Sequence, residues 1–356
     1  MKRLLSTVLA SVIGLSLVAC GSSSTATTTA AAAEETQASA AETKAEASTA
    51  SEAEYVIKVG HTLQENTPAH TGWLKFKEEV EKNSNGQIAV EIYPNSELGS
   101  ERVMFEQCQM GTLEIAYGTT SVLANFDQTF SVLDMPFLFS NEAAARKAVN
   151  GELGEKVAEG LADINLVKVC YMENGIRHVT NSQKAINTPD DLKGLKIRTM
   201  ENSIHMSTFS HLGASPTPMA FTELFTALQQ KTVDGEENPI FLIQTSRFDE
   251  VQKYLSLTGH FYTSGIATMN KDFYDSLPDD LKTVVLEAAA VARDAEYAAC
   301  DEQNATALEA LKKTMEVNEI SPENHQLFVE AAAPVYDEVR ALLGDEIVDL
   351  ALANAG

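Results

Sequence analysis

The sequence predicts an α/β fold built from two domains. At about 100–200 residues per domain, 356 residues correspond to roughly two domains, and 44% hydrophobic residues suffice for sizeable cores. Segments with strand and helix periodicity alternate from residue 55 onward, which favours a sheet with parallel pairs. The stretch 279–321 contains no Gly or Pro and predicts a helix too long for one small domain.

Residues 1–53 are not expected to belong to this fold. Residues 1–20 combine Lys2 and Arg3 with an apolar stretch shorter than the roughly 20 residues that span a bilayer, which predicts an export signal. They end in LVAC, which resembles a bacterial lipobox with Cys20 as the lipidated residue; an ordinary signal with a chance Cys is the alternative. Residues 21–53 are almost all Ser, Thr, Ala, Glu and Gln, so we expect a disordered tether. The protein would be lipid-anchored at the outer face of the cytoplasmic membrane, on the periplasmic side or at the cell surface.

The first half of the folded region reads as strands alternating with helices. Trp73, Phe76 and Val80 recur at i, i+3 and i+7, which indicates one face of a helix. A turn follows at 83–86, and a strand with alternating apolar residues ends at Tyr93 before Pro94. We expect strands at 56–59, 88–92 and 113–117, and helices around 73–80 and 101–110.

The second half repeats this alternation. Thr188 looks like the start of a helix, because Pro189 suits the first turn and Asp191 places a carboxylate three residues on. We expect strands at 166–172 and 195–198, a helix at 221–230 and a short strand after Gly235. The last helix would run from Pro278 to about Glu316, nearly 60 Å at 1.5 Å per residue. We expect it to run along more than one domain, with a bend allowed near 300–304.

Composition and motifs exclude several classes of protein. Lys and Arg total 26 against 51 Asp and Glu, and the net charge of −25 argues against a nucleic-acid binder and against docking on an anionic membrane. The sequence lacks the GxSxG, P-loop, HExxH and GxGxxG patterns, so we expect no enzyme, cofactor or metal centre. Cys108 and Cys170 lie in apolar stretches and are expected as buried free thiols.

Arg198 is the strongest candidate for a binding residue. It ends a predicted strand, where side chains of α/β proteins reach the crevice, and its planar guanidinium matches a carboxylate. An internal salt bridge is the alternative.

Arg177, after 174–176, is a similar candidate. Asn238 offers a donor and an acceptor, although Asn before Pro more often marks a turn. Phe221 could floor a pocket, although an aromatic residue at a helix start is more often core.

Longer motifs make the assignment more specific. They are GASPTPMAFTEL at 213–224, ALQQ at 227–230, VDG at 233–235, ENP at 237–239, YPNSELG at 93–99, LDMPFLF at 133–139 and LKGLKIR at 192–198. In this order they resemble the DctP-type solute-binding proteins of tripartite ATP-independent periplasmic (TRAP) transporters. The resemblance extends from about Tyr55 to the C-terminus.

The resemblance implies a two-lobed periplasmic-binding-protein fold (type II-like) with a central cleft and a long helix spanning both lobes. Lobe I would comprise 54–175 plus about 263–305, and lobe II 176–262 plus about 306–356. Arg198 would pair with the ligand carboxylate, Arg177 would occupy a second Arg position, and Phe221 and Asn238 would supply a ring and an amide contact. Weaker candidates for the cleft lining are His61, Glu101, Thr119 and His260.

The resemblance also implies the ligand and the partners. The protein would capture a small organic acid and deliver it to the small and large membrane subunits of a TRAP transporter. Gly60-His61 and the segment 99–102 look more like those of sugar-acid binders, for hexuronates for example. Glu101 would repel a second ligand carboxylate and hold hydroxyls, unless it caps its own helix. The alternatives are a four-carbon dicarboxylate or 2-oxoacid ligand, a ligand-sensing protein for a signalling receptor, and an exported lipoprotein enzyme.

Overall fold

The computed structural model describes residues 53–356. The predicted export signal, Cys20 and the predicted tether up to residue 52 lie outside these residues. No helix within 53–356 is both long and apolar enough to cross a membrane. The thiols of Cys108, Cys170 and Cys300 are free and buried, so the prediction for Cys108 and Cys170 is confirmed.

The N-terminal part of the fold alternates strands with helices, as the sequence predicts. Its elements are β1 (Tyr55–Gly60), α2 (Pro68–Asn83), β2 (Ile88–Tyr93), α3 (Glu101–Gln109), β3 (Ile115–Thr119), α4 (Thr120–Leu123), the 3-10 helix η1 (Gln128–Asp134), α5 (Glu142–Val149), α6 (Glu152–Ala158) and η2 (Glu159–Ile164). β1 pairs in parallel with both β2 and β3. Trp73, Phe76 and Val80 are buried on one face of α2, so the predicted periodicity is confirmed.

A second group of parallel strands follows. Its elements are η3 (Pro189–Leu192), β5 (Lys196–Thr199), α7 (Ser203–His211), β6 (Ser215–Pro218), α8 (Phe221–Gln229), β7 (Gly235–Pro239), α9 (Ile240–Thr245) and η4 (Phe248–Glu250). β5 pairs in parallel with β6 and β7. The helix predicted from Thr188 forms only a single 3-10 turn. Thr188 and Asp191 do make the expected capping box, but Gly194 follows at φ +81° and the chain turns into β5.

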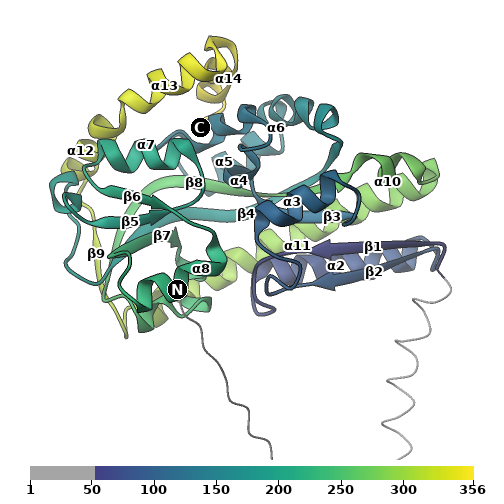
Figure 1. The fold of residues 1–356 in the computed structure, drawn as a ribbon, viewed down its shortest axis with the longest axis horizontal. Coiled ribbons are helices and arrows are strands. Elements are labelled where there is room, and N and C mark those ends of the chain that lie inside the picture. Colours follow the sequence, from purple (N-terminus) through teal and green to yellow (C-terminus); the bar gives the residue numbers. More distant parts are fainter. Residues whose placement is uncertain (1–52) are drawn as a thin grey trace, which may run out of the picture. The chain divides into compact units, whose positions relative to one another are not determined.

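Two long antiparallel strands join these groups (Figure 1). β4 (Leu166–Asn181) and β8 (Tyr254–Asn270) pair along most of their length. Eight of the nine strands in the sheet of the described residues follow the order β2-β1-β3-β8-β4-β7-β5-β6. β4 is longer than predicted, and β8 was not predicted. The register of the pair shifts between Glu173 and Gly175 and again between Arg177 and Val179. The sheet is therefore mixed, with irregular pairing where one group of strands gives way to the other.

The C-terminal part begins with helices and returns once to the sheet. Its elements are α10 (Lys271–Ser276), α11 (Asp279–Leu311), β9 (Glu316–Glu319), α12 (Pro322–Ala332), α13 (Pro334–Leu343) and α14 (Asp345–Ala353). α11 has 33 residues and is about 50 Å long. It ends before Glu316, because β9 pairs in parallel with β8. α11 contributes to the core beside β1–β3 and, through Leu311, to the core beside α8, so it spans both halves as predicted.

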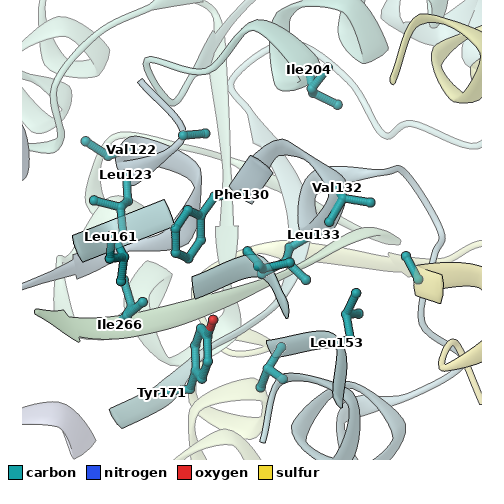
Figure 2. Packing of buried hydrophobic residues seen from close by; sticks show 14 of the residues in the cluster. Val122, Leu123, Phe130, Val132, Leu133, Leu153, Leu161, Tyr171, Ile204 and Ile266 are labelled. Atoms are coloured by element: carbon teal, nitrogen blue, oxygen red, sulfur yellow. The ribbon is translucent and has the colours of Figure 1, made fainter. Parts of the chain in front are cut away.

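Helices cover the sheet on both faces. On one face of β1–β3, Trp73 and Val285 belong to a cluster with side chains of α2 and α11. On the other face, Phe130 and Tyr171 lie in a cluster that Figure 2 shows in part, and it includes Ile204 of α7. The division into lobes stays a prediction. α13 and α14 join the cluster of Phe130 whereas α12 packs beside β5, so the C-terminal helices contact both halves.

Candidate functional site

Two small neighbouring cavities lie where the two groups of strands meet. Each has a volume of about 20 Å³, and both are lined by Glu101, Arg198, Met200 and Phe221. The other lining residues are Leu63, Ser100, Thr119, Val122, Asn174, Arg177, Glu201, Met219, Ala220, Asn238 and Leu242. They come from α3, β3 and β4 on one side and from β5, α8 and β7 on the other. The cavities lie between the predicted lobes, where the family resemblance predicts a cleft.

Arg198 is a buried cation that has no carboxylate partner among residues 53–356. It lies on β5 between two parallel neighbours, and only 2% of its surface is exposed. Its Nε and Nη2 donate to the carbonyl of Met219 at 3.0 and 2.7 Å, whereas Nη1 is buried with no hydrogen-bond partner among residues 53–356. Burial lowers the pKa of Arg198 to about 10, so the side chain is still charged at neutral pH. The internal salt bridge considered as an alternative does not form within the described residues.

Arg177, in contrast, is fully engaged. Its Nε donates to Glu237 Oε2 at 2.5 Å and its Nη2 to Glu237 Oε1 at 2.9 Å, which makes a buried bidentate pair. Nη1 donates to Asn174 Oδ1 at 2.9 Å, and Nη2 also reaches Asn238 Oδ1 at 3.1 Å. Burial alone would raise the pKa of Glu237, but the charge of Arg177 together with the nearby His205 and His260 holds that pKa well below its ordinary value. Arg177 therefore lines the cavity as half of an ion pair.

Glu101 faces Arg198 across the cavity. Its Oε2 accepts from the backbone N–H and from the Oγ1 of Thr119, at 2.9 and 2.7 Å. Ser100, and not Glu101, caps α3, so the alternative that Glu101 caps its own helix is wrong. Burial raises the pKa of Glu101, opposed by the Thr119 bonds and by the charges of Arg198 and Arg177. The second carboxylate oxygen makes no hydrogen bond within the described residues and can accept one from a ligand.

Asn238 and Phe221 also lie at the cavity. Asn238 belongs to β7 and is paired with His178 of β4, so it is not the turn residue that Asn-Pro suggested. Its Nδ2 donates to Glu236 Oε2 at 2.5 Å. Phe221 begins α8 and contacts Phe248 edge-on, with ring centroids 6.1 Å apart, while it lines both cavities. It is therefore both a core residue and a wall of the cavity.

Two predicted residues lie outside the lining. His61 is buried, and its Nε2 lies 3.2 Å from the Nδ1 of His70; burial lowers the pKa of His61 to about 3. His260 lies behind Arg177, with its Nε2 3.1 Å from Glu237 Oε2 and its Nδ1 2.7 Å from Thr258 Oγ1. The structure thus brings together six of the eight predicted residues. That any of them touches a ligand stays a prediction.

Glu237, Glu236 and Asn174 were missed as functional residues. All five residues of β7 are buried, two of them carboxylates. Glu237 is 60 positions from its partner Arg177, so no local pattern could join them. The signal that was present is the acidic pair next to Asn238 in the short strand predicted after Gly235.

Residues 59–341 match the family described as bacterial extracellular solute-binding protein, family 7. A solute-binding protein of Verminephrobacter eiseniae is 38% identical over 284 residues, covering 80% of this chain and 84% of the relative. The C4-dicarboxylate-binding periplasmic protein DctP of Rhodobacter capsulatus is 33% identical, covering 82% and 89%.

A crystal structure extends the likeness to the fold. The sugar acid binding protein DctPAm of Advenella mimigardefordensis, in complex with galactonate, superposes with a TM-score of 0.82 at 38% identity and covers 84% of this chain and 97% of that chain. The sheet order, the long helix and the match over residues 59–341 agree: the chain belongs to the DctP family of TRAP solute-binding proteins, with the two-lobed periplasmic-binding fold.

Proposed function

We propose that the protein captures a small monocarboxylic sugar acid by pairing its carboxylate with Arg198 and delivers it to the membrane subunits of a TRAP transporter. The observation that carries this proposal is a buried, charged guanidinium whose Nη1 has no partner within residues 53–356. A buried cation without a counter-ion is costly, and a ligand carboxylate would supply the missing charge and hydrogen bonds.

The rest of the cavity favours one carboxylate and several hydroxyls. Arg177 is already neutralised by Glu237, so it offers little to a second carboxylate. Glu101 adds negative charge and a free acceptor oxygen, which suits a hydroxyl group and repels a second acid group. The relative that binds galactonate points the same way, whereas the relative named for C4-dicarboxylates represents the alternative ligand. A sugar acid therefore fits better than a four-carbon dicarboxylate or a 2-oxoacid.

Binding requires the cavity to widen. A volume of about 20 Å³ accepts one water molecule, whereas ligand pockets measure about 300–1,000 Å³. We propose that the lobes, divided near 175, 262 and 305, open about β4 and β8 and close over the acid. Two of the three register shifts of that strand pair, at Glu173/Gly175 and at Arg177/Val179, lie at this boundary. Closure removes water and strengthens the pairing between Arg198 and the carboxylate.

A ligand screen tests the proposal. The purified full chain is heated with galactonate, galacturonate, glucuronate, succinate, pyruvate or galactose. A ligand at 1,000 times its Kd adds about 4 kcal/mol to the free energy of unfolding, which raises the Tm by several degrees. We expect a shift with at least one sugar acid and none with galactose. Arg198→Ala should abolish it, whereas Arg102→Ala, at an exposed Arg of α3 that pairs with Glu106, should not.

The outcomes separate the alternatives. A shift with succinate or pyruvate alone would keep the transport class and reject the sugar acid. An equal shift in Arg198→Ala and the parent would reject carboxylate capture by Arg198. Turnover of the bound acid, detected as a product mass, would indicate an enzyme.

We also propose that residues 1–20 direct export and that lipid on Cys20 anchors the protein through the tether 21–53. The supporting observation is the LVAC sequence after a short apolar stretch. The test is partition between detergent and aqueous phases. The parent and the Cys108→Ala control should enter the detergent phase, and Cys20→Ala should remain aqueous. A parent that stays aqueous would reject the anchor.

A further inference from the structure

A buried polar cluster beside the cavity joins two segments that are distant in sequence. Asp134 ends η1, whereas Asn202 caps α7 and His205 lies in its first turn; all three are buried. Asp134 accepts from Asn202 Nδ2 at 2.8 Å and from Ser121 Oγ at 2.5 Å. Its Oδ1 lies 3.2 Å from the Nε2 of His205. The carboxylate of Asp134 is thus held by donors from both segments.

The second face of His205 points toward the candidate site. Its Nδ1 lies 3.9 Å from Glu237 Oε1, beyond hydrogen-bond distance, and has no hydrogen-bond partner among residues 53–356. The ring stacks on Phe261, with centroids 4.1 Å apart and planes inclined by 15°. The imidazole therefore lies between two carboxylates. Burial lowers the pKa of His205, but Asp134 and Glu237 outweigh this and raise it, which favours the imidazolium.

Two buried acidic and two buried basic side chains then alternate in series. They run from Asp134 on η1 through His205 on α7 and Glu237 on β7 to Arg177 on β4, which lines the cavity. His260 on β8 is the remaining titratable group at Glu237, and burial lowers its pKa despite that contact, so it adds no charge near neutral pH. Asp134 belongs to predicted lobe I, whereas the other three belong to predicted lobe II.

We propose that Asp134 and His205 form a latch between the two lobes that positions Glu237, and through it Arg177, when the lobes are closed. The proposal rests on the proposed function, because positioning Arg177 matters only if the cavity takes an acid. His205 is a positioning residue, because it is not among the residues that line the two cavities. A histidine that merely fills the core against Phe261 would be neutral and indifferent to Asp134.

The first test needs no ligand. The protein, labelled with ¹³C and ¹⁵N in its seven histidines, is titrated by NMR, with His205→Gln and His211→Gln identifying the signals. We expect the His205 ring to titrate above the ordinary value of about 6.5, and its midpoint to fall in Asp134→Asn. A ring that is neutral at pH 6.5, or that ignores Asp134→Asn, would overturn the latch.

The second test measures affinity for galactonate by calorimetry. We expect His205→Gln and Asp134→Asn each to weaken binding about tenfold at pH 6.5. His211→Gln, the same change at an exposed histidine of α7 that pairs with Glu338, should leave the affinity unchanged. Binding to the parent should also weaken as the pH rises through the midpoint measured by NMR, because the imidazolium is lost, and His205→Gln should lose this dependence.

The two failures are distinguishable. If no acid binds the parent, the proposed function fails, and the NMR titration alone decides on the latch. If the parent binds galactonate and a folded His205→Gln binds it equally at every pH, the latch is wrong and the proposed function stands. Melting curves without ligand verify folding, and Asp134→Asn serves as the conservative variant if His205→Gln unfolds.

Discussion

Arg177 and Arg198 line the same cavity, yet their charges are balanced in different ways. Arg177 donates to both oxygens of Glu237 and to two asparagines, and its surroundings include two histidines that also contact Glu237. Arg198 donates only to a backbone carbonyl, and one of its nitrogens has no partner within the described residues. The difference supports the proposal that Arg177 belongs to the scaffold, whereas Arg198 binds an anionic ligand.

Of the substitutions considered, Arg177→Ala is expected to have the largest effect on stability. The change leaves Glu237 buried without its main counter-ion, so we expect the free energy of unfolding at pH 7 to fall by about 3–5 kcal/mol. Urea denaturation measures this, with the exposed Arg102→Ala as the control. A loss below about 1 kcal/mol would show that the histidines suffice to stabilise Glu237.

Arg198→Ala should have the opposite profile. Without ligand we expect the free energy of unfolding to stay within about 1 kcal/mol of the parent, because within residues 53–356 Arg198 forms no salt bridge and donates only to one backbone carbonyl. Affinity for the acid should fall by about 2–5 kcal/mol, and Arg198→Lys should also bind poorly because the planar fork is lost. Calorimetry and urea denaturation together check both halves. If Arg198→Ala strongly destabilised the protein but left the affinity unchanged, Arg198 would be the structural arginine and not the ligand-binding one.

The neighbouring carboxylates Glu236 and Glu237 are expected to affect how stability depends on pH in different ways. Within the described residues, Glu236 accepts hydrogen bonds only from Thr180 and Asn238, and burial raises its pKa to about 7. Its folded pKa lies above the unfolded value of about 4.5, so the folded state binds the proton more tightly, and stability falls as the pH rises through this window. Glu236→Gln stays neutral. We expect it to match the parent near pH 5 and to exceed it by roughly 2–3 kcal/mol near pH 9.

Urea denaturation at the two pH values checks this prediction. Glu237→Gln provides the contrast, because Glu237 is ionised through the same range and its loss should destabilise the protein at both pH values. Parallel pH profiles for Glu236→Gln and the parent would contradict the assignment.

The smallest expected effect concerns Glu101. Glu101→Gln keeps an acceptor for Thr119 but removes the charge, so the affinity for galactonate should fall by about 1 kcal/mol, the difference between a charged and a neutral hydrogen bond. The affinity for succinate should rise, because a repulsive charge is gone. Competition binding with the two acids measures the ratio. A change of the same sign for both ligands would remove Glu101 from the choice between them.

The sequence predicts well what depends on local pattern. Arg198 lies in the strand predicted at 195–198, which forms β5, and α11 follows from a stretch without Gly or Pro. The predicted end of α11 was wrong because a tertiary contact determines it. The chain leaves the helix to form β9, which pairs with β8.

The residues that were missed depend on contacts between distant segments. β8 is buried along most of its length on both faces, so it lacks the polar alternation that marks a strand with one solvated face. Glu237 is recognisable as a partner of Arg177 only once β4 and β7 are paired. Nothing in the sequence distinguishes His205 from the other six histidines. Its contact with Asp134 forms only when η1 packs against α7.

The crossing of β4, β8 and α11 between the two halves has a mechanical consequence. Three nearly inextensible segments resist sliding and twisting, so the lobes we propose are left with bending as their single easy movement. Two irregularities in the pairing of β4 with β8, at Glu173–Gly175 and at Arg177–Val179, lie beside Arg177 in this bridge. A single distance between two labels across the cleft, measured by spectroscopy, would then describe the opening motion. Open, intermediate and closed states would differ only in this one distance.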